Sequence, residues 1–266
     1  MADPFQNVDA AGADFIKVFA DAMDARQSDP TMEAIVAAYL GQLPFGRETL
    51  TIEVGAGAGA VSRRVAAAAA PGRVIGFEPS AGFVAEARAR AKDVSNLTFE
   101  QTDGATLPLK DGAADFVIMH TVLTHVPDPE ALLAEAMRVL KPGGRLVVCD
   151  ADFSKGSLSS FPNDPLDACA KAFTSDFVTD AFLVSRVRDM ATAIGFTVAT
   201  FSLTNRAIMD NMQMLPWVSE TCKQMAARGD IGQTLADALV GEYERRAASG
   251  SLYGFQVMGT MIADKP

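Results

Sequence analysis

The chain contains few of the residues on which whole classes of protein depend. Cysteine occurs three times, at positions 149, 169 and 222, without the paired spacing of zinc sites or the even number of a disulfide framework. Histidine occurs twice, at positions 120 and 125, which is not the spacing of a helical H-E-x-x-H metal pair. We therefore expect a reduced protein that has no metal site.

Long apolar runs and basic clusters are also missing. No run approaches the roughly 18 apolar residues that cross a bilayer, and residues 1–7 lack the basic and apolar regions of a signal peptide. The net charge is −10, and adjacent basic residues occur only at 63–64 and 245–246. Because a nucleic-acid-binding protein must neutralise phosphates with Lys and Arg, we expect a cytoplasmic protein with neither a membrane span nor a nucleic-acid partner.

The composition and the residue pattern are typical of a globular α/β protein. The 266 residues, 49% hydrophobic and 21% charged, suffice to bury a full core. Strand-like and helical runs alternate five times, which predicts right-handed crossovers and a parallel sheet. The expected strands are 50–53, 73–77, 97–101, 114–119 and 145–150, followed by 196–203 and 254–263.

A glycine-rich segment, EVGAGAG at residues 53–59, connects the first of these strands to the helix after it. Its three glycines let the backbone turn sharply and approach a ligand that any Cβ would repel. The N-terminus of the following helix offers free N–H groups and a positive dipole end. The segment therefore predicts the nucleotide-binding corner of a doubly wound sheet.

The loop by itself fits two nucleotide cofactors. Gly55-x-Gly57-x-x-Ala60 matches the dinucleotide pattern, which expects an acid about 20 residues further on, and Glu78 supplies that acid at the end of the second strand. A carboxylate there can accept hydrogen bonds from both ribose hydroxyls. NAD and S-adenosylmethionine both carry such a ribose.

Further motifs favour the second cofactor. Glu53 lies inside the first strand, where a dinucleotide enzyme usually has an apolar residue, and an Asp-Gly-Ala triplet at 103–105 follows the third strand. Three more motifs come in order at 107–120, 123–126 and 138–144. Together these motifs resemble those of class I S-adenosylmethionine-dependent methyltransferases, the group that includes the ubiquinone/menaquinone-biosynthesis enzymes and many bacterial small-molecule methyltransferases.

The resemblance implies a fold and an activity. The fold is a three-layer αβα Rossmann-like sheet of order 3-2-1-4-5-7-6, with strand 7 antiparallel, plus helical cap segments. The activity is methyl transfer from S-adenosylmethionine to an O, N or C atom of a small organic acceptor with apolar surface. Because the cofactor brings its own leaving group, proximity and orientation are expected to supply most of the catalysis.

The expected organisation places N-terminal helices over the site at residues 1–46 and the cofactor-binding core at 47–204. A lid-like insertion at 152–182 interrupts the core, a helical cap follows at 205–250, and 251–266 returns the final strand to the sheet. Aromatic residues and methionines recur in the insertion and the cap. Such side chains either line an adaptable apolar pocket or dock the cap helices on the sheet.

The resemblance assigns much of the cofactor site to the ends of the first two strands. The residues expected under the homocysteine part and the ribose are Gly55, Ala56, Gly57 and Gly59. Glu53 is expected to reach the amino-acid end of the cofactor. Glu78, followed by Pro79, is expected to accept hydrogen bonds from the ribose hydroxyls.

Three other places are expected to complete the cofactor site. Asp103 would accept from the adenine amino group, with the backbone of Gly104 and Ala105 passing close by. His120 would offer its backbone carbonyl to the cofactor ammonium group. Arg26, which precedes the sheet domain, would meet either the methionine carboxylate or a surface acid.

His125 is the candidate catalytic residue, because imidazole titrates near neutrality and is the usual general base. A structural histidine that holds its loop explains the same pattern equally well. Two other functions also stay open. One is an NAD(P)-dependent oxidoreductase, although none of the tyrosines at 39, 243 and 253 has a lysine four residues on; the other is a non-catalytic protein that keeps the cofactor fold.

Overall fold

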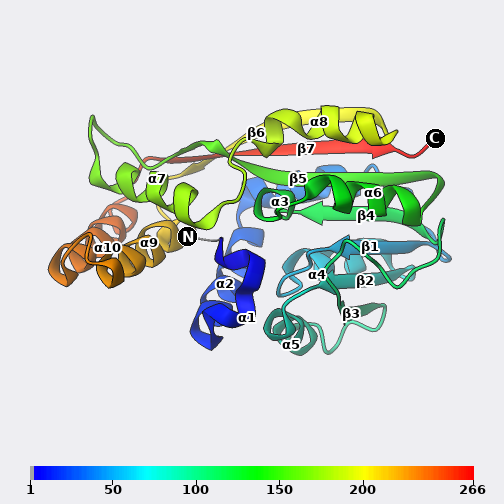
Figure 1. The fold of residues 1–266 in the computed structure, drawn as a ribbon, viewed down its shortest axis with the longest axis horizontal. Coiled ribbons are helices and arrows are strands. Elements are labelled where there is room, and N and C mark those ends of the chain that lie inside the picture. The colour runs from blue at the N-terminus through cyan, green and yellow to red at the C-terminus, as the bar shows by residue number, and fades with distance from the viewer. Residues whose placement is uncertain (1–2) are drawn as a thin grey trace.

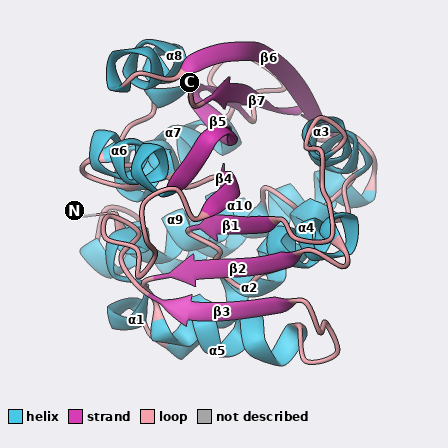
Figure 2. Ribbon diagram, turned by 90° about the vertical axis from the view of Figure 1, so that its right-hand side faces the viewer, coloured by secondary structure: helices cyan, strands magenta, loops and turns pink. Residues whose placement is uncertain are grey.

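The structure, a computed structural model, describes residues 3–266. Its centre is a seven-stranded sheet with the order β3-β2-β1-β4-β5-β7-β6 (Figure 2). The strands are β1 (Leu50–Val54), β2 (Arg73–Glu78), β3 (Leu97–Gln101), β4 (Ala114–His120), β5 (Leu140–Ser157), β6 (Thr197–Ile208) and β7 (Gly254–Asp264). Strands β1 to β5 pair in parallel, and β7 pairs antiparallel with β5 and β6. The predicted strand order and the antiparallel seventh strand are confirmed.

Helices cover both faces of this sheet (Figure 2). One face carries α3 (Pro30–Leu40), α4 (Ala60–Ala69) and α5 (Ala81–Arg90), and the other carries α6 (Pro129–Val139) and α8 (Leu183–Ile194). Strand β4 shows why there are two layers, because Phe116 and Ile118 join one apolar cluster while Val117 and Met119 join the other. The central strands are therefore buried on both sides, as parallel sheets are.

A second group of helices extends the molecule beyond one end of the sheet. It consists of α7 (Pro165–Phe177), α9 (Leu215–Arg228) and α10 (Gln233–Ala248), which pack against one another at the left of Figure 1. The N-terminal elements η1 (Pro4–Asn7), α1 (Val8–Ala11) and α2 (Ala13–Gln27) lie between this group and the sheet. None of the helices between residues 3 and 266 is long and apolar enough to cross a membrane.

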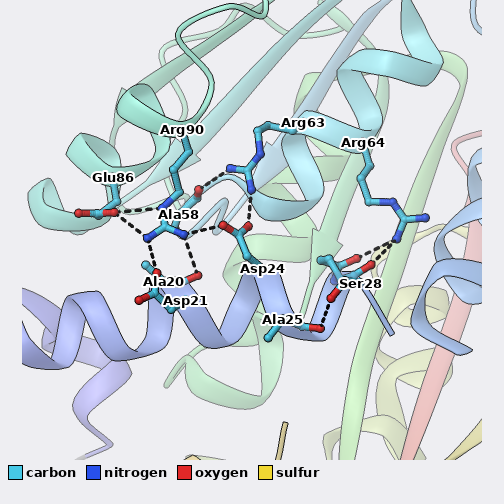
Figure 3. A network of polar contacts seen from close by, with 11 residues as sticks. Ala20, Asp21, Asp24, Ala25, Ser28, Ala58, Arg63, Arg64, Glu86 and Arg90 are labelled. Carbon is cyan, nitrogen blue, oxygen red and sulfur yellow. Dashed lines mark hydrogen bonds and ion pairs between the residues drawn. The ribbon is translucent and has the colours of Figure 1, made fainter. Parts of the chain in front are cut away.

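Helix α2 is fixed to the core by arginines of α4 and α5 (Figure 3). Arg63 of α4 and Arg90 of α5 both pair with Asp24, and Arg90 Nη1 lies 2.5 Å from its Oδ2. Further along α2, Arg64 donates to the side-chain oxygen of Gln27 at 3.1 Å. These contacts hold the face of α2 that carries Met23 and Arg26 against the end of the sheet.

Two strands differ in length from the prediction. β5, expected at 145–150, runs from Leu140 to Ser157, and β6, expected at 196–203, continues to Ile208. Antiparallel pairing with β7 extends the C-terminal ends of both strands, as in the pair of Arg206 with Gln256, while Leu140 at the start of β5 pairs with Ala114 of β4. Such pairing depends on a partner far away in the sequence, so the polar extensions did not show a strand pattern of their own. The boundaries predicted for the N-terminal, core and cap segments stay predictions.

Candidate functional site

The glycine loop between β1 and α4 has a conformation that few other residues could adopt. Gly55 and Gly57 have φ angles of 70° and 52°, in the left-handed region. A Cβ on Gly55 would lie 2.6 Å from Val122 Cγ2, and one on Gly57 would lie 2.8 Å from Met23 Sδ. The Gly55 N–H donates to Phe77 O of β2 at 2.8 Å. The loop is thus a fixed floor that other elements approach closely.

Glu78 ends β2 and directs its carboxylate at this loop. Its Oε2 accepts from Gly57 N at 2.8 Å, and its Oε1 accepts from Ser80 N at 3.0 Å. Burial raises the pKa of Glu78 to about 7, although both hydrogen bonds favour the charged form. Each carboxylate oxygen has a second lone pair, so the group can also accept from a ligand.

A cavity of about 460 Å³, the large cavity, lies at the carboxyl ends of the parallel strands, where open α/β sheets bind ligands. Its walls include six predicted cofactor residues, which are Gly55, Gly57, Glu78, Pro79, Asp103 and Ala105. Gly104 is not among the lining residues and packs against β1, because a Cβ there would lie 2.7 Å from Val54 Cγ1. Gly59 lies under the loop as the N-cap of α4. The structure therefore brings the predicted residues of three strand ends to one cavity.

Residues 3–11, which we call the roof segment, cross this cavity. Phe5, Gln6 and Val8 line it. At one side Gln6 Nε2 donates to Thr179 Oγ1 at 2.8 Å, and at the other Asp9 Oδ2 accepts from Ala81 N at 2.8 Å. The roof segment is therefore anchored on both sides of the cavity that it covers.

A smaller cavity of about 40 Å³ continues from the large one beneath α2. The predicted residues on its walls are Arg26, Glu53, Gly55, Ala56, Gly57 and His120. Glu53 accepts from Ser62 Oγ, and burial raises its pKa to about 8. Arg26 Nη2 donates to Thr121 Oγ1 at 3.0 Å, while its buried Nε has no hydrogen-bond partner in the described part of the chain. The small cavity is thus lined by a buried acid and by an arginine whose Nε is an unsatisfied donor.

The surroundings of the His120 ring do not suit it to act as an acid or a base. It is buried, with Nδ1 3.2 Å from Tyr39 Oη and Nε2 3.4 Å from Gln27 Nε2. Burial, reinforced by Arg26, holds its pKa well below the ordinary value, so the ring stays neutral. Its backbone carbonyl accepts from Thr121 Oγ1 at 2.7 Å and has a second lone pair.

Asp150, which lies within β5, binds the loop that follows β4. Its Oδ2 accepts from the backbone N–H groups of Val122, Leu123 and Thr124 at 3.1, 2.8 and 3.3 Å. Its Oδ1 accepts from Thr124 Oγ1 at 2.8 Å. Sequence reasoning missed this role, although an acid after the apolar run of β5 was a signal that could have found it.

His125 ends the short helix η2 (Leu123–His125) and contacts the roof segment. Its Nδ1 lies 2.9 Å from Asp3 Oδ2, and its ring centre lies 4.7 Å from that of Phe5. Asp3 was not predicted, because no local pattern connects it with a residue 122 positions away.

A third cavity, the aromatic chamber of about 100 Å³, adjoins the large cavity on the side of α7 and α9. Phe173 and Trp217 stack there with ring centres 5.2 Å apart, and Phe153 lies against Trp217 at 5.5 Å. The polar lining includes Arg206, whose Nε lies 3.4 Å from Asp29 Oδ1. The residues that line both the chamber and the large cavity are Phe5, Met23, Thr121 and His125.

Comparison with known proteins matches part of the sheet to a family. Residues 52–148 match a family model described as a methyltransferase domain. The chain is 36% identical over 148 residues to a demethylmenaquinone methyltransferase of Tropheryma whipplei, which covers 54% of this chain and 60% of the relative. It is 32% identical over 199 residues to an uncharacterized 37.1 kDa transposon protein of Streptomyces fradiae, covering 74% of this chain and 52% of the relative. The chain thus spans between half and two thirds of the length of these relatives.

A solved structure supports the same fold over more of the chain. The geranyl diphosphate C-methyltransferase of Streptomyces coelicolor A3(2), in complex with Mg²⁺, geranyl diphosphate and S-adenosyl-L-homocysteine, aligns with a TM-score of 0.55. The alignment covers 91% of this chain and 88% of that protein at 18% sequence identity. At this identity the likeness concerns the fold alone.

Proposed function

Because the chain belongs to the class I S-adenosylmethionine-dependent methyltransferases, we propose that it transfers the methyl group of this cofactor to a small organic acceptor with apolar surface. The observation that carries the proposal is the meeting of the large cavity with the aromatic chamber at four shared residues. One cavity has the predicted cofactor residues, and the other has the apolar walls of an acceptor pocket. A transfer reaction needs two such sites in contact.

The residues of the large and small cavities fit this cofactor. The Glu78 carboxylate would accept from the ribose hydroxyls, and the unsatisfied Arg26 Nε would donate to the methionine carboxylate. Glu53 would face the ammonium group, whose positive charge favours ionisation of this buried acid. When bound, the cofactor supplies an electrophilic methyl group and a neutral thioether leaving group.

The protein itself contributes position and exclusion of water. The stacked rings of Phe173 and Trp217 would hold the apolar part of the acceptor. The shared wall would direct its reacting atom towards the large cavity, and the roof segment would keep solvent out. Holding two reactants in line in this way supplies a large share of the rate enhancement.

The polar end of the chamber points to a further property of the acceptor. Arg206 is only 2% exposed and also donates to the side-chain oxygens of Gln213 and Gln256. All three side chains line the chamber. We propose that a polar group of the acceptor, opposite the reacting atom, is recognised there.

Calorimetric titration separates this function from the NAD(P)-dependent alternative. We expect S-adenosylmethionine and S-adenosylhomocysteine to bind and NAD⁺ and NADP⁺ not to bind. Binding of a nicotinamide cofactor alone would refute the proposal. Formation of S-adenosylhomocysteine with a panel of phenols, amines and carbon acids then separates an enzyme from a non-catalytic relative, which would bind the cofactor but show no turnover.

A further inference from the structure

His125 and Asp3 form a pair that nothing in the local sequence announces. His125 Nδ1 lies 2.9 Å from Asp3 Oδ2, and two other groups orient the same carboxylate. Phe5 N donates to its Oδ1 at 2.9 Å, and Thr179 Oγ1 donates to its Oδ2 at 3.0 Å. The two side chains are 14% and 3% exposed, so the pair is largely shielded from water. Hydrogen bonds to a charged group are strong in such surroundings.

The pairing fixes which ring nitrogen is free. A carboxylate accepts hydrogen bonds and does not donate them, so His125 Nδ1 carries the proton and the neutral ring has its lone pair on Nε2. The same ring lines both the large cavity and the aromatic chamber. The nitrogen left to act as a base therefore belongs to a side chain at the boundary between the proposed cofactor site and the proposed acceptor site.

Holding the loop does not require the His125 ring. The backbone N–H groups of 122–124 bind Asp150, and the Thr124 carbonyl accepts from Thr179 N at 3.0 Å. The ring itself contacts Asp3 and lies near Phe5 and Phe153. Its position at the cavity boundary is thus available for chemistry.

Other charged groups surround the pair without replacing Asp3 as its partner. The ionisable side chains that face the two cavities from neighbouring elements are Arg26 of α2, Glu78 of β2, Asp103 after β3, Asp128 before α6 and Arg206 of β6. Asp150 of β5 is near enough for its ionisation to be favoured by a charged His125. Asp3 is the acid in direct contact with the ring among the described residues.

We propose that Asp3 is the positioning residue of a general base, His125, and that the acceptor is a phenol, an inference that rests on the methyl transfer proposed above. The aromatic chamber, of about 100 Å³, is lined by the rings of Phe153, Phe173 and Trp217. Its stacked walls suit a flat aromatic group.

In the proposed step His125 Nε2 takes the proton of the phenolic hydroxyl while the oxygen forms its bond to the methyl carbon. The bond from that carbon to sulfur breaks, its electron pair stays on sulfur, and the positive charge passes from the sulfonium to the imidazolium. Asp3 stabilises the imidazolium through Nδ1–H. An amine or carbanion acceptor would have less need of such a pair.

The test compares Asp3→Asn with the parent protein on two probes, phenol and the more acidic 4-nitrophenol. Asparagine removes the charge, and its single amide oxygen can accept from either Phe5 N or His125 Nδ1–H. We expect kcat to fall about 10²-fold for phenol and about tenfold or less for 4-nitrophenol, because a more acidic hydroxyl needs the base less. Asp3→Glu, which restores the charge, should recover part of the loss. Cofactor affinity should stay within about threefold.

Asp9→Asn is the matched control, because it loosens the same roof segment through contacts with Ser80, Ala81 and Gly82 rather than through His125. A loss from loosening alone should be equal for the two probes. An equal loss in Asp3→Asn, or none, would overturn the inference, as would methylation of aniline without methylation of any phenol. Failure of the parent to bind S-adenosylmethionine would instead overturn the proposed function.

A spectroscopic readout does not depend on turnover. The chain has only two histidines, so ¹⁵N-labelled imidazoles can be assigned with a His120→Gln or His125→Gln variant. We expect the neutral His125 ring of the parent to be the Nδ1–H tautomer, and the Asp3→Ala variant to lose this preference. A neutral Nε2–H tautomer in the parent would overturn the pairing on which the inference depends.

Discussion

Glu53 and Glu78 are carboxylic acids in places where charge is costly. They are 1% and 5% exposed, and burial raises their pKa values to about 8 and about 7. A cationic ligand at Glu53 and donor groups at Glu78 would favour the ionised forms. The cofactor-free protein therefore stores an unfavourable desolvation that binding can relieve.

The burial of Glu53 makes the stability of the protein depend on pH in a definite direction. A carboxyl with a pKa of 4.5 when unfolded and about 8 when folded binds its proton more tightly in the folded state, so its effect on stability worsens as pH rises from 4.5 to 8. We predict that the free energy of unfolding of Glu53→Gln, relative to that of the parent, increases as pH rises from 4.5 to 8. Denaturant unfolding at several pH values measures this difference. Buried His120, whose lowered pKa makes stability rise with pH, is present in both proteins, so its contribution cancels.

A constant difference between Glu53→Gln and the parent would show that the acid is ionised throughout. The exposed strand residue Glu100, varied as Glu100→Gln, serves as the control and should show no such trend.

The assignment of Glu78 to the ribose has its own test. Glu78→Ala should lose two charge-assisted hydrogen bonds to the cofactor, worth about 1.5–3 kcal/mol each, so affinity for S-adenosylmethionine should fall at least tenfold. Glu100→Ala, at the neighbouring strand, should bind as the parent does. Calorimetry that finds equal affinities for Glu78→Ala and the parent would remove Glu78 from the proposed site.

At the scale of elements, the glycine loop and α2 meet at Gly57 and Met23. We predict that Gly57→Val abolishes cofactor binding while far-ultraviolet circular dichroism stays native. Its Cβ would lie 2.8 Å from Met23 Sδ, and its φ of 52° is strained for a branched residue. Combining Gly57→Ala with Met23→Ala offers space to the smaller side chain and should restore more binding than Gly57→Ala alone. Normal affinity in a folded Gly57→Val protein would contradict a ligand above this loop.

The elements also show which parts of the fold a sequence can predict. The apolar runs and glycine turns of β1 to β4 are local signals, and these strands begin at the predicted residues. The C-terminal extensions of β5 and β6 exist because β7 pairs with both, and no window of sequence contains that pairing. The predicted order and the reversed seventh strand came from the resemblance to a family, not from the strand pattern.

The same distinction applies to the candidate site. The loop glycines and Glu78 were found because each follows a strand at a fixed spacing. Asp3 and Arg206 were not found, because their roles depend on contacts with residues far along the chain, such as His125 and Asp29. A side chain whose function is created by tertiary packing gives no local pattern to read.

At the scale of the whole molecule, the proposed acceptor site draws on a part of the chain that the proposed cofactor site does not use. The methyltransferase family model ends at residue 148. The chamber residues that lie beyond that point are Phe153, Phe173, Arg206, Gln213, Met214, Pro216, Trp217 and Gln256. The acceptor specificity that we propose can therefore change through these residues while the cofactor site stays as it is.

We predict that two substitutions, one in each cavity, have opposite effects on acceptor and cofactor binding. Trp217→Leu should raise the KM for the acceptor about tenfold and leave the affinity for S-adenosylmethionine within about twofold. Phe83→Leu, which alters the large cavity, should do the reverse. Calorimetry and steady-state kinetics on both variants measure the two effects. Parallel losses in both properties for both variants would mean that the cavities act as one site.

The roof segment also bears on the timing of the proposed reaction. If its anchors on both sides of the cavity release for the cofactor to leave, Gly12, which has a φ of 92° and open space around its missing Cβ, would serve as the pivot between the segment and α2. Opening about this pivot would then be a step of every catalytic cycle, and its rate would be an upper limit on turnover. Release of S-adenosylhomocysteine would then be limited by the opening of the roof segment and not by the rate of methyl transfer.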